Sequence, residues 1–256
     1  LEGWDRIDPP ASGAVHWTAG GGEVVVIRGF GFQAEGSLGL PAAQYTCFFR
    51  AGENSQNTTA NVTDTTMVQC LTPNWGEAFA TSVAELLIVR DGVVIPYFGG
   101  DSQAGACSAG DATCTIFFFD EVSGLSSNAG AASGGYDLLV EAAGLDPGIN
   151  YYCNFSANGS EAQSLPVAPT STVELTCVVP KWGYEPGNVS FTLHGDTSGR
   201  LVAASRPFRF NFRSSWSAKS RDSAPARGGT LLDVDVAGLS SAFAYDCVLA
   251  HGDNEA

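Results

Sequence analysis

The chain has 256 residues, with 27 acidic and 12 basic side chains and a formal net charge of −15 at pH 7. Phosphate binding needs a basic surface stripe, so this balance argues against nucleic acid as a partner and against docking on an anionic membrane. Hydrophobic residues make up 44% of the chain and charged residues 15%, a composition that excludes a disordered protein. No apolar run approaches the roughly 20 residues of a membrane-spanning helix, so we expect no membrane insertion in this segment.

Short apolar runs predict β-strands along the whole chain. In chain order, residues 24–27, 86–89 and 117–119 are apolar runs bounded by Gly, Asp or Arg, as buried strands are. Residues 189–194 and 208–213 alternate between apolar and polar side chains, which places the phenylalanines in a core and the arginines in water. No window carries an apolar helical stripe longer than about two turns. The predicted fold class is therefore all-β.

A strand bounded by glycines recurs three times in the sequence. Its copies run over residues 22–31, 135–144 and 229–238, and each is followed by Tyr-x-Cys, at Tyr45/Cys47, Tyr151/Cys153 and Tyr245/Cys247. The first two copies continue to Cys-x-x-Pro-x-Trp-Gly, at residues 70–76 and 177–183. Each complete copy is predicted to be a sandwich of short strands, about 90 residues long.

The repeat divides the chain into two complete sandwiches and part of a third. We expect a first domain over residues 1–98, a linker over 99–117, a second domain over 118–213 and the first half of a third over 214–256. The third copy ends soon after Cys247, and the partner of this cysteine is expected beyond Ala256. The chain begins at Leu1, so we expect a processed product or a piece of a longer protein.

Cysteine spacing predicts three disulfides and one unpaired thiol. Cys47 and Cys70 are 23 residues apart and Cys153 and Cys177 are 24 apart, so each pair is expected to bridge its own sandwich. By loop-closure entropy each bridge contributes about 3–4 kcal/mol. Cys107 and Cys114 are expected to staple the linker, and a metal site at this pair is disfavoured because no third ligand lies nearby. Cys247 remains unpaired or available for an intermolecular bond.

The order of the motifs indicates an Ig-like sandwich that is not of the antibody type. An antibody domain has its Trp between the two cysteines and Tyr-x-Cys at the second, whereas here Tyr-x-Cys is at the first and Trp follows the second. Residues 21–32 and 68–76 resemble the IPT/TIG Ig-like domain of plexins, hepatocyte-growth-factor-type receptors and transcription factors. The second copy departs from the pattern at Ala142 and Val179, and the third resembles it only as far as Cys247.

This resemblance extends to a class of surface proteins. The Cys-x-x-Pro-x-Trp form is similar to versions in large surface and mastigoneme-like glycoproteins of algae and other protists. The resemblance implies a β-sandwich used for adhesion, assembly or receptor architecture, usually without catalysis. It leaves the partner undefined.

Five Asn-x-Ser/Thr triplets indicate a secreted glycoprotein. They lie at Asn57, Asn61, Asn154, Asn158 and Asn188, where the composition predicts roughly two by chance. Together with the cysteine pattern, this excess favours an extracellular location, at the cell surface or secreted. Since glycans need solvent, all five are expected on loops or outward strand faces.

Several residues could suggest chemistry, and a structural interpretation is favoured for each. His16, His194 and His251 are far apart in the sequence, with no neighbouring nucleophile in a recognised motif. The glycines at 20–22 and 29–31 lack the helix and Lys of a phosphate-binding loop, so strand entry and turns explain them. We therefore expect no enzyme and no catalytic residue.

Two further residue types have a ligand-binding alternative. Asp233-x-Asp235 and Asp253-Asn-Glu255 could bind calcium through oxygen, but alternating acids on a wet strand face are favoured, so no metal or cofactor is expected apart from N-linked glycans. Trp75 and Trp182 could stack on sugars, but their identical place after the proline favours packing at a strand exit.

The leading functional hypothesis is a structural glycoprotein, a subunit of an extracellular filament or cell-surface appendage. The half-formed third unit would expose unpaired strand edges, and completion by a neighbouring or continuing chain would produce a head-to-tail polymer. The alternative is a receptor or adhesin ectodomain that binds a protein or carbohydrate through its loops.

Overall fold

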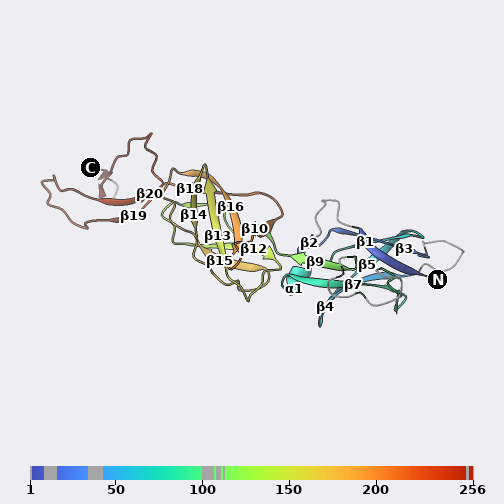
Figure 1. Cartoon of the computed structure of the whole chain (residues 1–256). Helices are drawn as coiled ribbons and strands as arrows, with labels where there is room; N and C mark the ends of the chain where they lie inside the picture. The colour runs from blue at the N-terminus through green and yellow to red at the C-terminus, as the bar shows by residue number, and fades with distance from the viewer. Residues whose placement is uncertain are drawn as a thin grey trace.

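A computed structural model describes residues 2–8, 16–33, 43–99, 107, 111, 113–251 and 254–255. These residues are mostly β-strand, with a single helical turn, α1 (Trp75–Ala78). The all-β prediction is confirmed. Three units follow one another along the long axis of the molecule, the first near the N-terminus and the third near the C-terminus (Figure 1). Within the described residues, no helix is long and apolar enough to cross a membrane.

The first unit is one continuous sheet that curls around a core. Its strands are β1 (Gly3–Asp8), β2 (His16–Thr18), β3 (Val24–Phe30), β4 (Tyr45–Ala51), β5 (Asn54–Asp64), β6 (Met67–Leu71), β7 (Ser82–Arg90), β8 (Val93–Val94) and β9 (Thr115–Phe119). The order is β1-β3-β6-β5-β4-β7-β9-β2, with β8 paired to β7. The long strand β5 pairs with β4 in its first part and with β6 in its second, so it joins the two faces.

The second unit repeats these ladders as two separate sheets. Its strands are β10 (Glu121–Leu125), β11 (Ala129–Ala131), β12 (Asp137–Ala143), β13 (Tyr151–Ala157), β14 (Ser160–Gln163), β15 (Glu174–Val178), β16 (Gly187–Gly195), β17 (Ala203–Ala204) and β18 (Phe208–Arg213). One sheet has the order β15-β12-β10-β17 and the other β11-β18-β16-β13-β14. The succession β10-β12-β15 corresponds to β1-β3-β6 in the first unit, and β11-β18-β16-β13 corresponds to β2-β9-β7-β4.

Strand alternation builds the cores as the sequence predicts. In β18, Phe208, Phe210 and Phe212 are buried, whereas Arg209 and Arg213 are exposed. Full burial of such a side chain stabilises the fold by roughly 1.5–3 kcal/mol. Each complete unit therefore has its own hydrophobic core.

The expected linker over residues 99–117 is wrong at its C-terminal end. Residues 115–119 form β9, which pairs with β7 and β2 in the first unit, and Phe118 is fully buried in the first core. Cys107 and Cys114 are buried in the same core. The pair therefore belongs to the first unit, because burial of Phe118 and Cys114 outweighs the loop-like composition around them.

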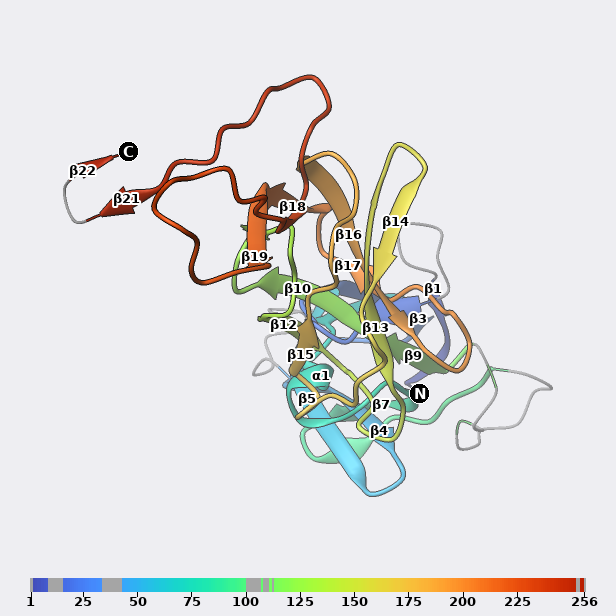
Figure 2. The ribbon, with the colours of Figure 1, turned by 90° about the vertical axis from the view of Figure 1, so that its left-hand side faces the viewer.

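Among the described residues, the third unit contains the first ladder of the repeat but not the ladders that follow it in the other two units. β19 (Ser215–Lys219) pairs with β20 (Val234–Ala237), as β1 pairs with β3 and β10 with β12. A separate pair, β21 (Ala250–His251) and β22 (Asn254–Glu255), follows near the C-terminus. Seen from the third-unit end, the other two units overlap in projection, while long loops of the third unit extend to one side (Figure 2).

Backbone details show that the third ladder follows the repeat. The first strand of each ladder has a bulge at the same place, between Trp4 and Arg6, Val122 and Gly124, and Trp216 and Ala218. The glycine that ends each repeated segment has a positive φ, at 78° for Gly31, 78° for Gly144 and 66° for Gly238. A β-carbon disfavours this conformation, so glycine is required at a turn of the repeat.

Candidate functional site in the third unit

A tyrosine hydrogen bond fixes the path of the chain in all three units. The Tyr45 hydroxyl accepts a hydrogen bond from the Gln33 amide at 3.0 Å. The Tyr151 hydroxyl accepts one from Asp146 at 3.0 Å, and the Tyr245 hydroxyl accepts one from Ser240 at 2.9 Å. The third unit therefore follows the repeat as far as Tyr245, two residues before Cys247.

Beyond Tyr245 the third unit departs from the other two. In the complete units the Tyr-x-Cys motif lies in strands β4 and β13, whose cysteines bridge to β6 and β15. Residues 244–249 form no strand, and Cys247 is free and exposed. Within the described residues, β20 pairs with β19 alone.

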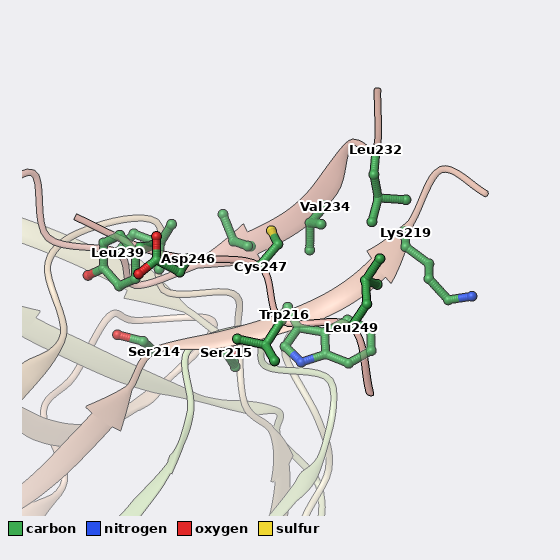
Figure 3. Close-up of a pocket in the computed structure, with 13 residues that line it drawn as sticks. Ser214, Ser215, Trp216, Lys219, Leu232, Val234, Leu239, Asp246, Cys247 and Leu249 are labelled. Atoms are coloured by element: carbon green, nitrogen blue, oxygen red, sulfur yellow. The ribbon is translucent and has the colours of Figure 1, made fainter. Parts of the chain in front are cut away.

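The incomplete sandwich leaves an apolar groove of about 430 Å³. Its lining includes Trp216, Leu232, Val234, Leu239, Val248 and Leu249, with Cys247 among them (Figure 3). The groove lies between the β19–β20 ladder and the segment that carries the Tyr-x-Cys motif.

Equivalent side chains show that this groove is an uncovered core. Trp216 is 65% exposed, whereas Trp4 and Val122 at its position in the complete units are 1% and 2% exposed. Leu249 is 67% exposed, whereas Phe49 and Phe155 at its position are fully buried. Since contiguous apolar exposure of this kind marks an interaction surface, the groove is the candidate functional site.

The two joints between successive units share a contact between a glycine and an alanine. Across the first joint, the Gly144 amide donates a hydrogen bond to the Gly76 carbonyl at 3.3 Å. A Cβ added at Gly144 would lie 2.6 Å from the Ala19 Cβ. A Cβ added at Gly238 would lie 2.6 Å from the Ala132 Cβ. The contact between glycine and alanine is thus repeated at the second joint. The rest of the joint differs, because a Cβ added at Gly76 would lie 2.2 Å from the Gly144 amide nitrogen, whereas nothing lies within 4 Å of one added at Gly183.

A buried carboxylate lies at the start of the second unit. Asp120 is fully buried and receives two hydrogen bonds of 2.6 Å from the Arg200 guanidinium, and Tyr151 donates to it at 3.2 Å. Burial, together with the Asp120 charge, raises the pKa of the Tyr151 hydroxyl, while the Asp146 amide opposes the shift. This pair lets the polar start of the second unit pack beside the first.

The first unit has a corresponding cluster, and the third does not. Tyr45 donates to Glu2, which pairs with Arg90 at 2.9 Å, and burial followed by this hydrogen bond raises the pKa of Tyr45 to about 12. In the third unit Ser214 takes the place of the acid and donates to the Gly238 carbonyl at 2.6 Å. The third unit therefore keeps the joint but replaces the acid with a neutral hydroxyl.

Three disulfides join the cysteines that the sequence pairs. They are Cys47–Cys70, Cys107–Cys114 and Cys153–Cys177. The two tryptophans that follow the second cysteines pack inside the cores. Trp75 stacks on Phe118 with ring centroids 5.0 Å apart, and Trp182 stacks on Phe212 at 5.1 Å. This burial confirms packing at a strand exit as the favoured interpretation.

The glycosylation triplets lie in different surroundings. Asn57, Asn61, Asn158 and Asn188 are exposed. Asn154 is only 8% exposed, within a hollow that Asn158 and Asn188 also line. Asn154 lies at an outward position of β13, as expected, but neighbouring segments cover it there, so it lacks the solvent exposure that a glycan needs.

The other candidate residues do not gather into a site. The His194 ring lies within hydrogen-bonding distance of Thr192 and the Gly199 carbonyl and stacks on Tyr152. His16 and His251 lie in strands β2 and β21. No three His, Cys, Asp or Glu side chains approach closely enough to hold a metal ion among the residues that the structure describes.

The acidic residues for which calcium binding was the disfavoured alternative form no cluster within the described part of the chain. Asp235 pairs with Lys181 at 3.1 Å and accepts a hydrogen bond from Ser217 at 3.0 Å, and both interactions lower the pKa of its carboxyl. The Asp233 amide donates to Ser220. Asp253 lies outside the described residues, and Glu255 lies in β22.

Sequence reasoning missed the residues that form the joints. Ala19, Ala132, Gly144 and Gly238 carry no chemical signature, since small residues with this role are common in any sequence. Their repeated positions were the available signal. Each alanine lies three residues before the glycine that begins a repeated segment, and each glycine lies seven residues before the tyrosine of Tyr-x-Cys.

No family model and no curated protein matches this sequence. Among solved structures, the plexin A4 full extracellular region is 11% identical over 91% of this chain, with a TM-score of 0.27, and this chain spans 27% of its length. The chicken CNTN1 FN1-FN3 domains are 13% identical, with coverages of 82% and 68% and a TM-score of 0.25. A tetra-tandem repeat in the extending region of a large adhesion protein is 13% identical, with coverages of 87% and 53% and a TM-score of 0.29. At these identities the matches carry no conclusion about partners.

Proposed function

We propose that this chain is part of an extracellular structural glycoprotein, built from tandem IPT/TIG-like units, that assembles head-to-tail into a filament or surface appendage. The observation that carries the proposal is the glycine–alanine contact that recurs at both joints, together with the apolar groove of the third unit. Head-to-tail contacts between like units do not close on themselves, so they build a linear array.

The chemistry of the chain supports the extracellular setting. Disulfides persist in oxidising compartments, and three are present among the described residues. Four exposed Asn-x-Ser/Thr triplets and a net charge of −15 suit a solvated, glycan-covered surface. The mastigoneme-like resemblance of the Cys-x-x-Pro-x-Trp motif supports an appendage as the site of assembly.

The mass of the native protein under non-denaturing conditions tests this proposal. An antibody raised against residues 1–256 would capture the protein in its native form, for light scattering and electron microscopy before and after mild reduction. We expect linear particles of several subunits. A clean, glycan-bearing monomer would contradict the proposal and favour the receptor or adhesin alternative, in which the units position a ligand-binding loop.

A further inference from the structure

The complete units show which strand is missing from the groove. In the first unit, Val25 of β3 lies opposite Cys70 of β6, and Ile27 lies opposite Val68. In the second unit, Leu138 of β12 lies opposite Cys177 of β15, and Val140 lies opposite Leu175. In both cases an aliphatic residue precedes the cysteine by two positions, so both side chains face the core.

The same register can be transferred to the third unit. Leu232 and Val234 occupy the positions of Leu138 and Val140, and both side chains line the groove. A strand that pairs with this edge would place its cysteine opposite Leu232 and its aliphatic residue opposite Val234. Its apolar face would then cover the side chains that remain exposed.

The position of Cys247 agrees with this register. The disulfides of the complete units join Cα atoms 6.5 and 6.2 Å apart, within the range that an unstrained bridge requires. Cys247 corresponds to Cys47 and Cys153 in the sequence repeat, and it lines the groove (Figure 3). A cysteine opposite Leu232 would therefore meet the Cys247 thiol.

The glycine that contacts a proline in each complete unit provides an independent observation, because its counterpart in the third unit has no such neighbour. A Cβ at Gly21 would lie 2.4 Å from the Pro73 carbonyl oxygen, and one at Gly134 would lie 2.5 Å from the Pro180 carbonyl carbon. In both units this proline comes three residues after the bridging cysteine. Gly228 has the corresponding backbone conformation, with φ of 73°, but nothing lies within 4 Å of its added Cβ.

We propose that the third-unit groove binds a strand of this protein's own repeat type, with the pattern aliphatic-x-Cys-x-x-Pro, supplied from outside residues 1–256. The strand pairs antiparallel with β20 and the residues before it, seats its proline at Gly228 and forms a disulfide with Cys247. This inference rests on the proposed function and specifies the chemistry of the contact that completes the third unit.

Disulfide formation requires an oxidant, and a mixed disulfide with glutathione supplies it. The Cys247 thiolate attacks the strand sulfur, the bond between Cys247 and the strand forms, and the bond between the strand and glutathione breaks. The leaving glutathione thiolate takes up the proton that Cys247 lost. One thiol and one disulfide are therefore present both before and after the exchange.

A peptide from the second unit provides a direct test. Residues 172–180 carry the sequence Thr-Val-Glu-Leu-Thr-Cys-Val-Val-Pro, which has the required pattern and no tryptophan. The peptide, with Cys177 as its glutathione mixed disulfide, would be mixed with the chain and the cross-linking rate followed by mass spectrometry. The matched control is the same peptide with Leu175→Asp, which keeps the thiol chemistry and removes the apolar anchor.

We expect the parent peptide to cross-link to Cys247 at least tenfold faster than the Leu175→Asp peptide. A thiol-free arm uses the chain with Cys247→Ser and the peptide with Cys177→Ser, and follows acrylamide quenching of tryptophan fluorescence. Trp216 is 65% exposed, whereas the other four tryptophans are at most 3% exposed, so the quenchable signal belongs to the groove. Binding of the strand is expected to protect Trp216.

Equal rates for the two peptides together with unchanged quenching would overturn the inference. A preference for a symmetric Cys247–Cys247 dimer over the peptide adduct would also overturn it, because the groove would then have no selectivity for the strand. These outcomes do not depend on the size of the native particle. Strand binding can therefore fail while the filament proposal stands, and the filament proposal can fail while strand binding is observed.

Discussion

At the residue scale, small side chains decide how the units join. Gly144 has φ of 78° and packs against Ala19, and Gly238 makes the same contact with Ala132. The positive φ and the missing Cβ are separate requirements, and each alone would select glycine. Gly135 meets only the first of these requirements, because its φ is 80° but there is open space where its Cβ would lie.

Replacing Gly144 by alanine is expected to destabilise the molecule more than the same change at Gly135. Both substitutions place a non-glycine residue in the left-handed region, at a cost of about 1–2 kcal/mol. Gly144→Ala also forces its Cβ against Ala19, which adds about 1–3 kcal/mol of overpacking. Urea unfolding of the two variants measures the difference. Equal losses would show that the joint tolerates a methyl group and that only the backbone conformation matters.

At the element scale, each sandwich is closed by strands that are distant in sequence. β3 pairs with β6 in one sheet, and β12 pairs with β15. A disulfide ties each of these covering strands, β6 and β15, to β4 or β13 across the core. The third unit contains β19 and β20 but no covering strand among the described residues. Its apolar groove follows directly from that missing element.

The disulfides are expected to differ in what they contribute to stability. In the chain-entropy relation, the Cys153–Cys177 separation of 24 residues corresponds to about 3.5 kcal/mol, and the Cys107–Cys114 separation of 7 to about 2.5 kcal/mol. Each pair would be replaced by alanines and the free energy of unfolding measured in urea. A larger loss at Cys107–Cys114 would mean that burial of this pair in the first core, rather than loop closure, dominates its contribution.

At the scale of the whole molecule, most of the glycosylation triplets lie on the exposed surface. Four of the five asparagines are exposed, and they lie on the first and second units. Asn154 is the exception, because its side chain is covered and its amide oxygen has no hydrogen-bond partner among the described residues. A glycan at this position would have to displace the segments around it.

Glycan mapping of the secreted protein is therefore expected to find sugar at Asn57, Asn61, Asn158 and Asn188 and none at Asn154. Enzymatic deglycosylation in heavy-oxygen water, followed by peptide mass spectrometry, marks each occupied asparagine. As a matched pair, Asn57→Gln should remove the mass of one glycan, whereas Asn154→Gln should leave the glycan mass unchanged. Occupancy at Asn154 would show that the covering segments move aside.

The sequence by itself determined the fold class, the strand pattern and the pairing of six cysteines. These follow from local signals that survive without tertiary contacts: alternation in residues 208–213, glycines that end strands and the spacing of Tyr-x-Cys motifs. The repeat strengthened these predictions, because a pattern that occurs three times shows which positions of the three units are equivalent. The same repetition identified Cys247 as unpaired.

Only the tertiary structure decided where the units meet and what each core contains. Phe118 lies in the first unit because it stacks on Trp75, a partner 43 positions earlier in the chain. The burial of Asn154 and the contact of Gly144 with Ala19 likewise depend on residues far away in sequence. Such contacts arise from packing between elements, and no local pattern encodes them.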